Sequence, residues 1–272
     1  MTDGEWAVVR QSFPTPGWME GRGGRPESYC HRQMIDAVRY LVDNGVKWRS
    51  LPVDFPPWDR VYAFFRRWRD DELVHELHDR LRARVRLSEG RDAEPSAAVV
   101  DSQSVRAGAT VKNVSRGFDG GKKINGRKRH LIVDCLGLLL DVLVTPASTP
   151  DRDAARMMLP VVRDRFPALR RVWADGGYTG HLLDWAAQQL GLVVEVVKRN
   201  DHRAGFAVLP RRWVVERTFA WLMRTRRLAR DYETRPASSQ AMILWSTTMI
   251  CGRRLARLTP ARTPRLHWPT TA

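Results

Sequence analysis

Three carboxylates stand where they could bind metal ions. Asp101 follows the apolar run 97–100, Asp175 follows the run 171–174, and Glu216 lies one turn into an amphipathic segment. Carboxylates can hold two Mg²⁺ or Mn²⁺ ions about 3.5–4 Å apart, and such a pair stabilises charge on both the attacking and the leaving oxygen of a phosphodiester. These residues therefore predict metal-dependent phosphodiester chemistry.

Each acid also has a purely structural interpretation. Asp101 could be a turn residue at a strand end, Asp175 begins an Asp-Gly-Gly turn, and Glu216 could pair with Arg212 one helical turn away. Asp134 and Asp141, in an expected hairpin, could face the site or solvent. Asp151 and Asp153 lie at a helix start, where the helix dipole explains them.

The elements around these acids alternate between strands and helices after residue 96. Apolar runs predict strands at 97–101, 130–133, 138–144, 171–174 and 192–198, and helical patterns cover 149–166, 180–190 and 211–230. This order predicts a mixed five-stranded sheet with flanking helices, as in ribonuclease H-like folds, over residues 97–252. In that fold the first and fourth strands are neighbours, so the three carboxylates should converge.

The first 90 residues predict a small all-α domain, separated from the sheet by the polar segment 88–96. The stretch 58–69 is basic and aromatic, which indicates a helix-turn-helix-like DNA-binding module that would use Arg66 and Arg67. A plain helical packing or dimerisation domain fits this pattern equally well. The tail 253–272 contains bases but no acids, and we expect it to be mobile.

The charge of the chain points to nucleic acid. The net charge is +16, and residues 91–272 carry 31 Lys and Arg against 16 Asp and Glu. Much of the excess lies in two runs, one of them in an expected basic loop over 108–129. The sequence shows no membrane span, secretory signal, phosphate-binding loop for a nucleotide cofactor or disulfide framework, so we expect a cytoplasmic protein.

Five blocks of the sequence resemble a known family. They are Trp48-Arg-Ser-Leu-Pro-Val-Asp-Phe-Pro-Pro-Trp58, Val100-Asp-Ser-Gln-Ser-Val105, Gly126-Arg-Lys-Arg-His130, Ala174-Asp-Gly-Gly-Tyr-Thr-Gly180 and Arg211-Arg-Trp-Val-Val-Glu-Arg-Thr-Phe-Ala-Trp-Leu222. The chain resembles the DDE transposases of bacterial insertion sequences, in the group named after insertion sequence 5. Related transposases often carry a Tyr where this chain has Leu209 and a Lys where it has Met223, with Arg224 one residue further on.

The resemblance implies a transposase that binds the terminal inverted repeats of its element, cuts with Mg²⁺ or Mn²⁺, and joins the 3′-OH to target DNA. Asp101, Asp175 and Glu216 would be the catalytic and metal-binding residues. Phosphate contacts would come from basic residues, namely Arg127, Lys128, Arg129, His130, Arg212, Arg224 and Arg227. The partner would be double-stranded DNA, bound by a homodimer or larger assembly in the bacterial cytoplasm at the nucleoid.

Two other functions share these features. A decayed or repurposed copy would bind DNA without cutting it, and a structure-specific nuclease would cut without joining. Intact Asp, Asp and Glu blocks argue against the first. Only a strand-transfer product separates a transposase from the second.

Overall fold

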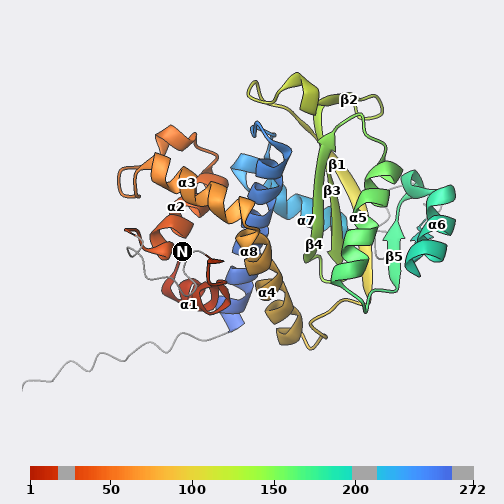
Figure 1. Ribbon diagram of the computed structural model, residues 1–272, viewed down its shortest axis with the longest axis horizontal. Coiled ribbons are helices and arrows are strands. Elements are labelled where there is room, and N and C mark those ends of the chain that lie inside the picture. Colours follow the sequence, from red (N-terminus) through yellow and green to blue (C-terminus); the bar gives the residue numbers. More distant parts are fainter. Residues whose placement is uncertain (18–27, 198–212, 259–272) are drawn as a thin grey trace, which may run out of the picture.

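The computed structural model describes residues 1–17, 28–197 and 213–258. Helices occupy one side of the molecule and a sheet the other, with one long helix between them (Figure 1). Arg212 and Leu209, both singled out by the sequence, lie outside the described residues.

The N-terminal region is helical, as the sequence predicts. Its helices are α1 (Asp3–Ser12), α2 (His31–Asn44), α3 (Trp58–Asp70) and α4 (Leu73–Ser88), with the 3-10 turn η2 (Trp48–Ser50). The Thr2 hydroxyl caps α1 by accepting from the Glu5 backbone N–H at 3.1 Å. Gly45 ends α2 with a φ of 71°, and its N–H bonds to the Leu41 carbonyl.

The sheet is mixed and has the predicted core order. Its strands are β1 (Ala97–Arg106), β2 (Gly117–Asp119), β3 (Ile124–Asp134), β4 (Leu139–Pro146), β5 (Arg171–Ala174) and β6 (Val193–Val196). β3 pairs antiparallel with β1, β2 and β4, whereas β5 pairs parallel with both β1 and β6. The order β4-β3-β1-β5-β6, with the short β2 added on β3, is a ribonuclease H-like sheet.

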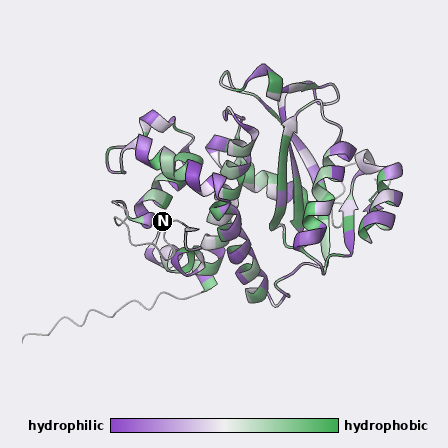
Figure 2. Cartoon of the chain, viewed as in Figure 1, coloured by the Kyte–Doolittle hydropathy of each residue, from purple (hydrophilic) through white to green (hydrophobic). Residues whose placement is uncertain are grey.

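Helices cover both faces of the sheet (Figure 1). One core lies between the sheet and the pair α5 (Asp151–Arg165) and α6 (His181–Leu190). On the opposite face a second, continuous core joins the sheet to α7 (Trp213–Met223), α8 (Pro236–Leu258) and all four N-terminal helices. Figure 2 shows the hydrophobic colouring gathered on the central strands, where both cores meet. The N-terminal helices are therefore packed onto the sheet-bearing half of the chain through α8.

The sequence did not predict α8, which at 23 residues is the longest described helix. Ser238, Ser239, Thr247 and Thr248 are buried along with its apolar side chains, so the helix has no wide polar face. A helix buried nearly all round lacks the period-3.6 contrast that marks an amphipathic one. α8 also continues to Leu258, so the expected mobile tail begins as helix at Arg253.

Three expected boundaries were wrong. β1 runs on to Arg106, because residues 103–106 pair with residues 126–129 of β3 although most of these residues have polar or basic side chains. The residues expected in a basic loop up to position 129 therefore form strand β3 from Ile124. The long helix expected up to Arg230 ends at Met223 and is followed by the 3-10 turn η5 (Arg226–Leu228).

Candidate active site

Asp101 lies on β1, and Asp175 directly follows the neighbouring parallel strand β5. The β1–β5 register pairs Ala97 with Arg171 and continues to Val99 with Trp173. Carrying it two residues further places Asp101 opposite Asp175. Side chains alternate along a strand, so Asp101 shares the side of Val99, which is the face covered by α7 and α8.

The turn after β5 holds Asp175 in a defined orientation. Its Oδ1 accepts from the Gly177 backbone N–H at 2.8 Å, which caps the 3-10 turn η4 (Gly176–Tyr178). A Cβ added to Gly177 would lie 3.0 Å from Asp175 Oδ1 and 3.4 Å from Asp151 Oδ2. A side chain there would crowd both carboxylates. Asp151 thus belongs to the surroundings of Asp175, a role that its place in a first helical turn hid from the sequence.

Tyr178 is a buried phenol whose pKa responds to the nearby acids. Its side chain is 1% exposed, and its hydroxyl has no hydrogen-bond partner among the described residues. Burial raises the pKa of Tyr178 well above its usual value, and the charges of Asp101, Asp151 and Asp175 raise it further. The nearby Ser102 hydroxyl lowers this pKa in part. The negative charges of all three carboxylates therefore disfavour ionisation of this one buried phenol.

Lys128 and His130 border this group from β3. Lys128 Nζ lies 3.1 Å from Asp151 Oδ1 and donates to the Thr149 carbonyl at 2.9 Å. His130 is 1% exposed, and burial lowers its pKa to about 4, so its imidazole is neutral at pH 7. Its Nε2 lies 3.0 Å from the Thr145 hydroxyl. Lys128 offsets part of the negative charge beside Asp175, and His130 adds none.

Glu216 is exposed on the first turn of α7. The opposite side of this helix packs through Val214 and Val215, and the Thr218 hydroxyl donates to the Gly137 carbonyl at 2.8 Å. No group of three or more His, Cys, Asp or Glu side chains within the described ranges is arranged to hold a metal ion. Asp101, Asp151 and Asp175 all lie close enough to Tyr178 to raise its pKa, and α7 presents Glu216 on the face of the sheet that Asp101 shares.

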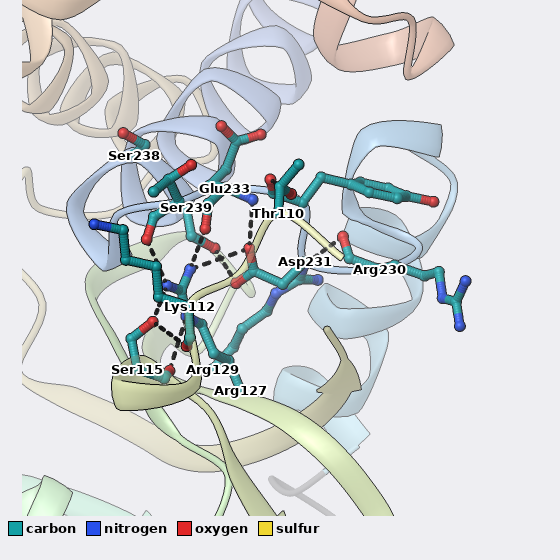
Figure 3. A network of polar contacts seen from close by, with 12 residues as sticks. Thr110, Lys112, Ser115, Arg127, Arg129, Arg230, Asp231, Glu233, Ser238 and Ser239 are labelled. Atoms are coloured by element: carbon teal, nitrogen blue, oxygen red, sulfur yellow. Dashed lines mark hydrogen bonds and ion pairs between the residues drawn. The ribbon is translucent and has the colours of Figure 1, made fainter. Parts of the chain in front are cut away.

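The basic run in β3 is buried, contrary to its predicted role as a DNA-facing loop. Arg127 and Arg129 are both 0% exposed. Arg127 donates to the carbonyls of Ser115, Glu233 and Thr234 and pairs with the Asp231 carboxylate (Figure 3).

Arg129 donates to the Leu228 carbonyl at 2.8 Å, and burial lowers its pKa to about 10. Together, Arg127 and Arg129 bind the segment 228–234 to the sheet. A phosphate could reach either guanidinium only by displacing these bonds.

The remaining basic residues expected to contact DNA differ in how exposed their side chains are. Arg227 is 8% exposed and bonded to the Glu233 carboxylate and the Val46 carbonyl, so it is structural. Arg66 and Arg67 are exposed on α3. Arg224 is exposed just beyond α7 and lines a cleft of about 360 Å³ together with Arg217, Arg253, Arg254 and Arg257. This cleft is a basic surface that the charge count alone could not locate.

No helix of the described residues is both long and apolar enough to cross a bilayer.

The family model described as "Transposase DDE domain" matches residues 92–251, and one described as "Putative transposase of IS4/5 family" matches residues 1–78. A protein of Burkholderia cepacia, "Putative transposase for insertion sequence element IS402", is 31% identical over 144 residues. That alignment covers 48% of this chain and 65% of the relative. On this sheet and these matches, the chain belongs to the IS4/IS5-like transposases with a DDE domain.

Proposed function

We propose that this protein binds the terminal inverted repeats of its insertion sequence and catalyses metal-dependent DNA cleavage and strand transfer. The parallel pairing of β1 with β5 carries the proposal, because its register, carried two residues beyond Val99 and Trp173, would set Asp101 opposite Asp175. Helix α7, which presents Glu216, packs on the same face of the sheet as Asp101. A dimer or larger assembly would act, since two element ends must be joined, in the bacterial cytoplasm at the nucleoid.

The side chains present fit hard divalent cations. Asp101, Asp175 and Glu216 offer carboxylate oxygens, the donors that Mg²⁺ and Mn²⁺ favour. The Tyr178 hydroxyl, which is buried beside two of these acids without a partner, supports a polar occupant there. Bound ions would stabilise charge on the attacking and leaving oxygens of the phosphodiester.

The other site residues would orient the carboxylates and the DNA. Lys128 holds Asp151 by an ion pair, which lowers the repulsion around Asp175. Arg224 is exposed beyond the end of α7, where it would contact a phosphate of the strand beside Glu216. Arg66 and Arg67 would contact the repeat from the helical region 1–90. Arg212 remains a proposed phosphate contact on the sequence pattern alone.

The deciding experiment incubates the protein with Mg²⁺ and a plasmid that carries the repeats flanking its own gene, and sequences the junctions. End-specific cuts and joined product are expected from the wild type and not from Asp175→Asn. Asp184→Asn, which changes an exposed acid on α6, is the matched control and should retain both activities. Cuts that are never joined would indicate a nuclease instead.

A DNA-binding protein without catalysis is the second candidate. One observation favours it, since the described residues hold no group of three or more His, Cys, Asp or Glu side chains placed to bind a metal ion. Repeat-specific binding without cutting, in wild type and Asp175→Asn alike, would support this function and exclude the transposase reaction.

A further inference from the structure

A groove of about 650 Å³ lies between α3 and the segment Arg227–Ser238, away from the acids of the candidate active site. Its lining includes six basic side chains, which are Lys47, Arg49, Arg66, Arg69, Arg227 and Arg235. The one acid in the lining, Glu233, is already paired with Arg227. Arg69 is occupied by Asp70 and by the Ser238 hydroxyl.

The positive charges of the other four basic side chains are not neutralised by an ion pair with a described residue. No acidic group of the described residues lies within ion-pair distance of Lys47, Arg49, Arg66 or Arg235. Uncompensated cations in one groove attract a polyanion and gain free energy from counterion release. The groove therefore suits a phosphate-bearing strand.

Aromatic rings in the same groove make it more than a phosphate site. Trp58, Tyr62 and Tyr232 line the groove and are each 36–37% exposed, so part of each ring is open to a ligand. The guanidinium of Arg49 lies 5.3 Å from the Trp58 ring centre, and that of Arg227 lies 5.6 Å from the Tyr232 ring centre. The bases of a duplex are stacked on one another, whereas unpaired bases can stack on the rings.

One wall of the groove is fixed before any ligand binds. The Glu233 and Thr234 carbonyls accept from Arg127 at 2.7 and 3.0 Å (Figure 3). The Gly108 backbone N–H donates to the Asp231 carbonyl at 2.6 Å. A Cβ on Gly108 would come within 2.9 Å of the Tyr232 ring, so the glycine leaves the room in which that ring packs. Fixed walls reduce the entropy lost on binding.

We propose that this groove binds a short single-stranded stretch of DNA, with bases stacked on Trp58, Tyr62 and Tyr232 and phosphates held by the four bases. The proposal rests on the proposed function, which makes DNA the partner, and adds a separate site for unpaired nucleotides. It also gives the buried network of Figure 3 a role, since Arg127 holds the wall that carries Tyr232.

The test measures binding of fluorescent oligonucleotides by anisotropy. One probe is a blunt duplex of the terminal repeat, the second adds a short single-stranded extension, and the third carries the same extension without bases. The extension should tighten binding by about 5- to 150-fold for each stacked base. The extension without bases should lose most of this gain.

Variants separate stacking from charge. Trp58→Ala and Tyr232→Ala should each remove one stacked base's share of the gain from the extension and keep the affinity for the blunt duplex. Phe118→Ala, which truncates an exposed ring on β2, should change neither. Arg235→Gln should weaken the extended probe and lower its salt slope by about 0.7. If Tyr232→Ala does not fold, Tyr232→Leu replaces it.

Two failures are distinguishable. If the blunt repeat does not bind at all, the proposed function fails. If it binds and the extension adds nothing, or if the ring variants retain the gain, the groove does not hold unpaired nucleotides.

Discussion

Arg127 and Asp231 are 104 residues apart in the chain, and their side chains meet at 3.3 Å with neither exposed to solvent. The contact joins β3, a neighbour of the strand that carries Asp101, to the segment that follows α7. Asp231 also accepts from the Glu233 backbone N–H and the Ser239 hydroxyl (Figure 3). The pair thereby ties the helix of Glu216 to the sheet of Asp101.

Arg127→Met should destabilise the protein by about 3–5 kcal/mol, because it leaves the Asp231 carboxylate buried without its partner. Urea unfolding followed by circular dichroism measures the loss. Arg106→Met removes an exposed guanidinium and is the control, with an expected change within about 0.5 kcal/mol. A loss below about 1 kcal/mol for Arg127→Met would contradict a structural role for this pair.

Gly126→Ala should cost about 3 kcal/mol or more, because the new methyl group would overlap the Val105 carbonyl and force β1 and β3 apart. Gly120→Ala is the matched substitution, since nothing lies within 4 Å of the added carbon there. Its unfolding midpoint in urea should stay near that of wild type. Equal midpoints for the two variants would show that the strands tolerate the added carbon.

Acid should destabilise the protein through His130. The pKa of His130 is about 4 in the fold and about 6.5 unfolded, so the fold favours the neutral imidazole. This stabilisation is fully present above pH 6.5 and is lost as the pH falls from 6.5 to 4. The free energy of unfolding should drop by up to about 3 kcal/mol over this range. His75, whose pKa is also about 4, acts in the same window.

His130→Gln should therefore flatten, without abolishing, the fall in unfolding free energy between pH 6.5 and 4. His181→Gln, at an exposed position on α6, should leave the profile unchanged. Urea titrations at four pH values check both. The same slope in wild type and His130→Gln would mean that this imidazole does not resist protonation.

Tyr178→Phe should stabilise the DNA-free and metal-free protein by about 1 kcal/mol, because it removes a buried hydroxyl without a partner and keeps the ring. Thermal unfolding in the presence of a chelator measures the change. Tyr62→Phe, at a partly exposed ring, should have little effect. A lower melting temperature for Tyr178→Phe would show that the hydroxyl is satisfied in solution.

The sequence was most informative where local rules govern structure. The N-terminal helices and the strands β1 and β5 follow from apolar periodicity along neighbouring residues. The Asp175 turn is also local, since its two glycines follow directly in the chain. Such features need no knowledge of distant contacts.

Distant contacts decided the rest. A basic run such as Arg127–Arg129 suggests a surface, because burying a guanidinium is costly unless every donor finds an acceptor. Those acceptors include the carbonyls and the carboxylate of 228–234, which lie about 100 residues away in the chain. Nothing in the sequence of the run itself indicates them. α8 was missed for a related reason, since burial by partners on all sides removes the periodic contrast that marks a helix.

The sequence by itself determined which acids could do chemistry and which sheet would carry them. Only the tertiary structure decided that Asp151 and Tyr178 join Asp101 and Asp175, and that the exposed charge lies in two clefts instead of the basic run of β3. The physical reason is that burial and charge pairing depend on which segments pack together, and packing is settled by the whole chain.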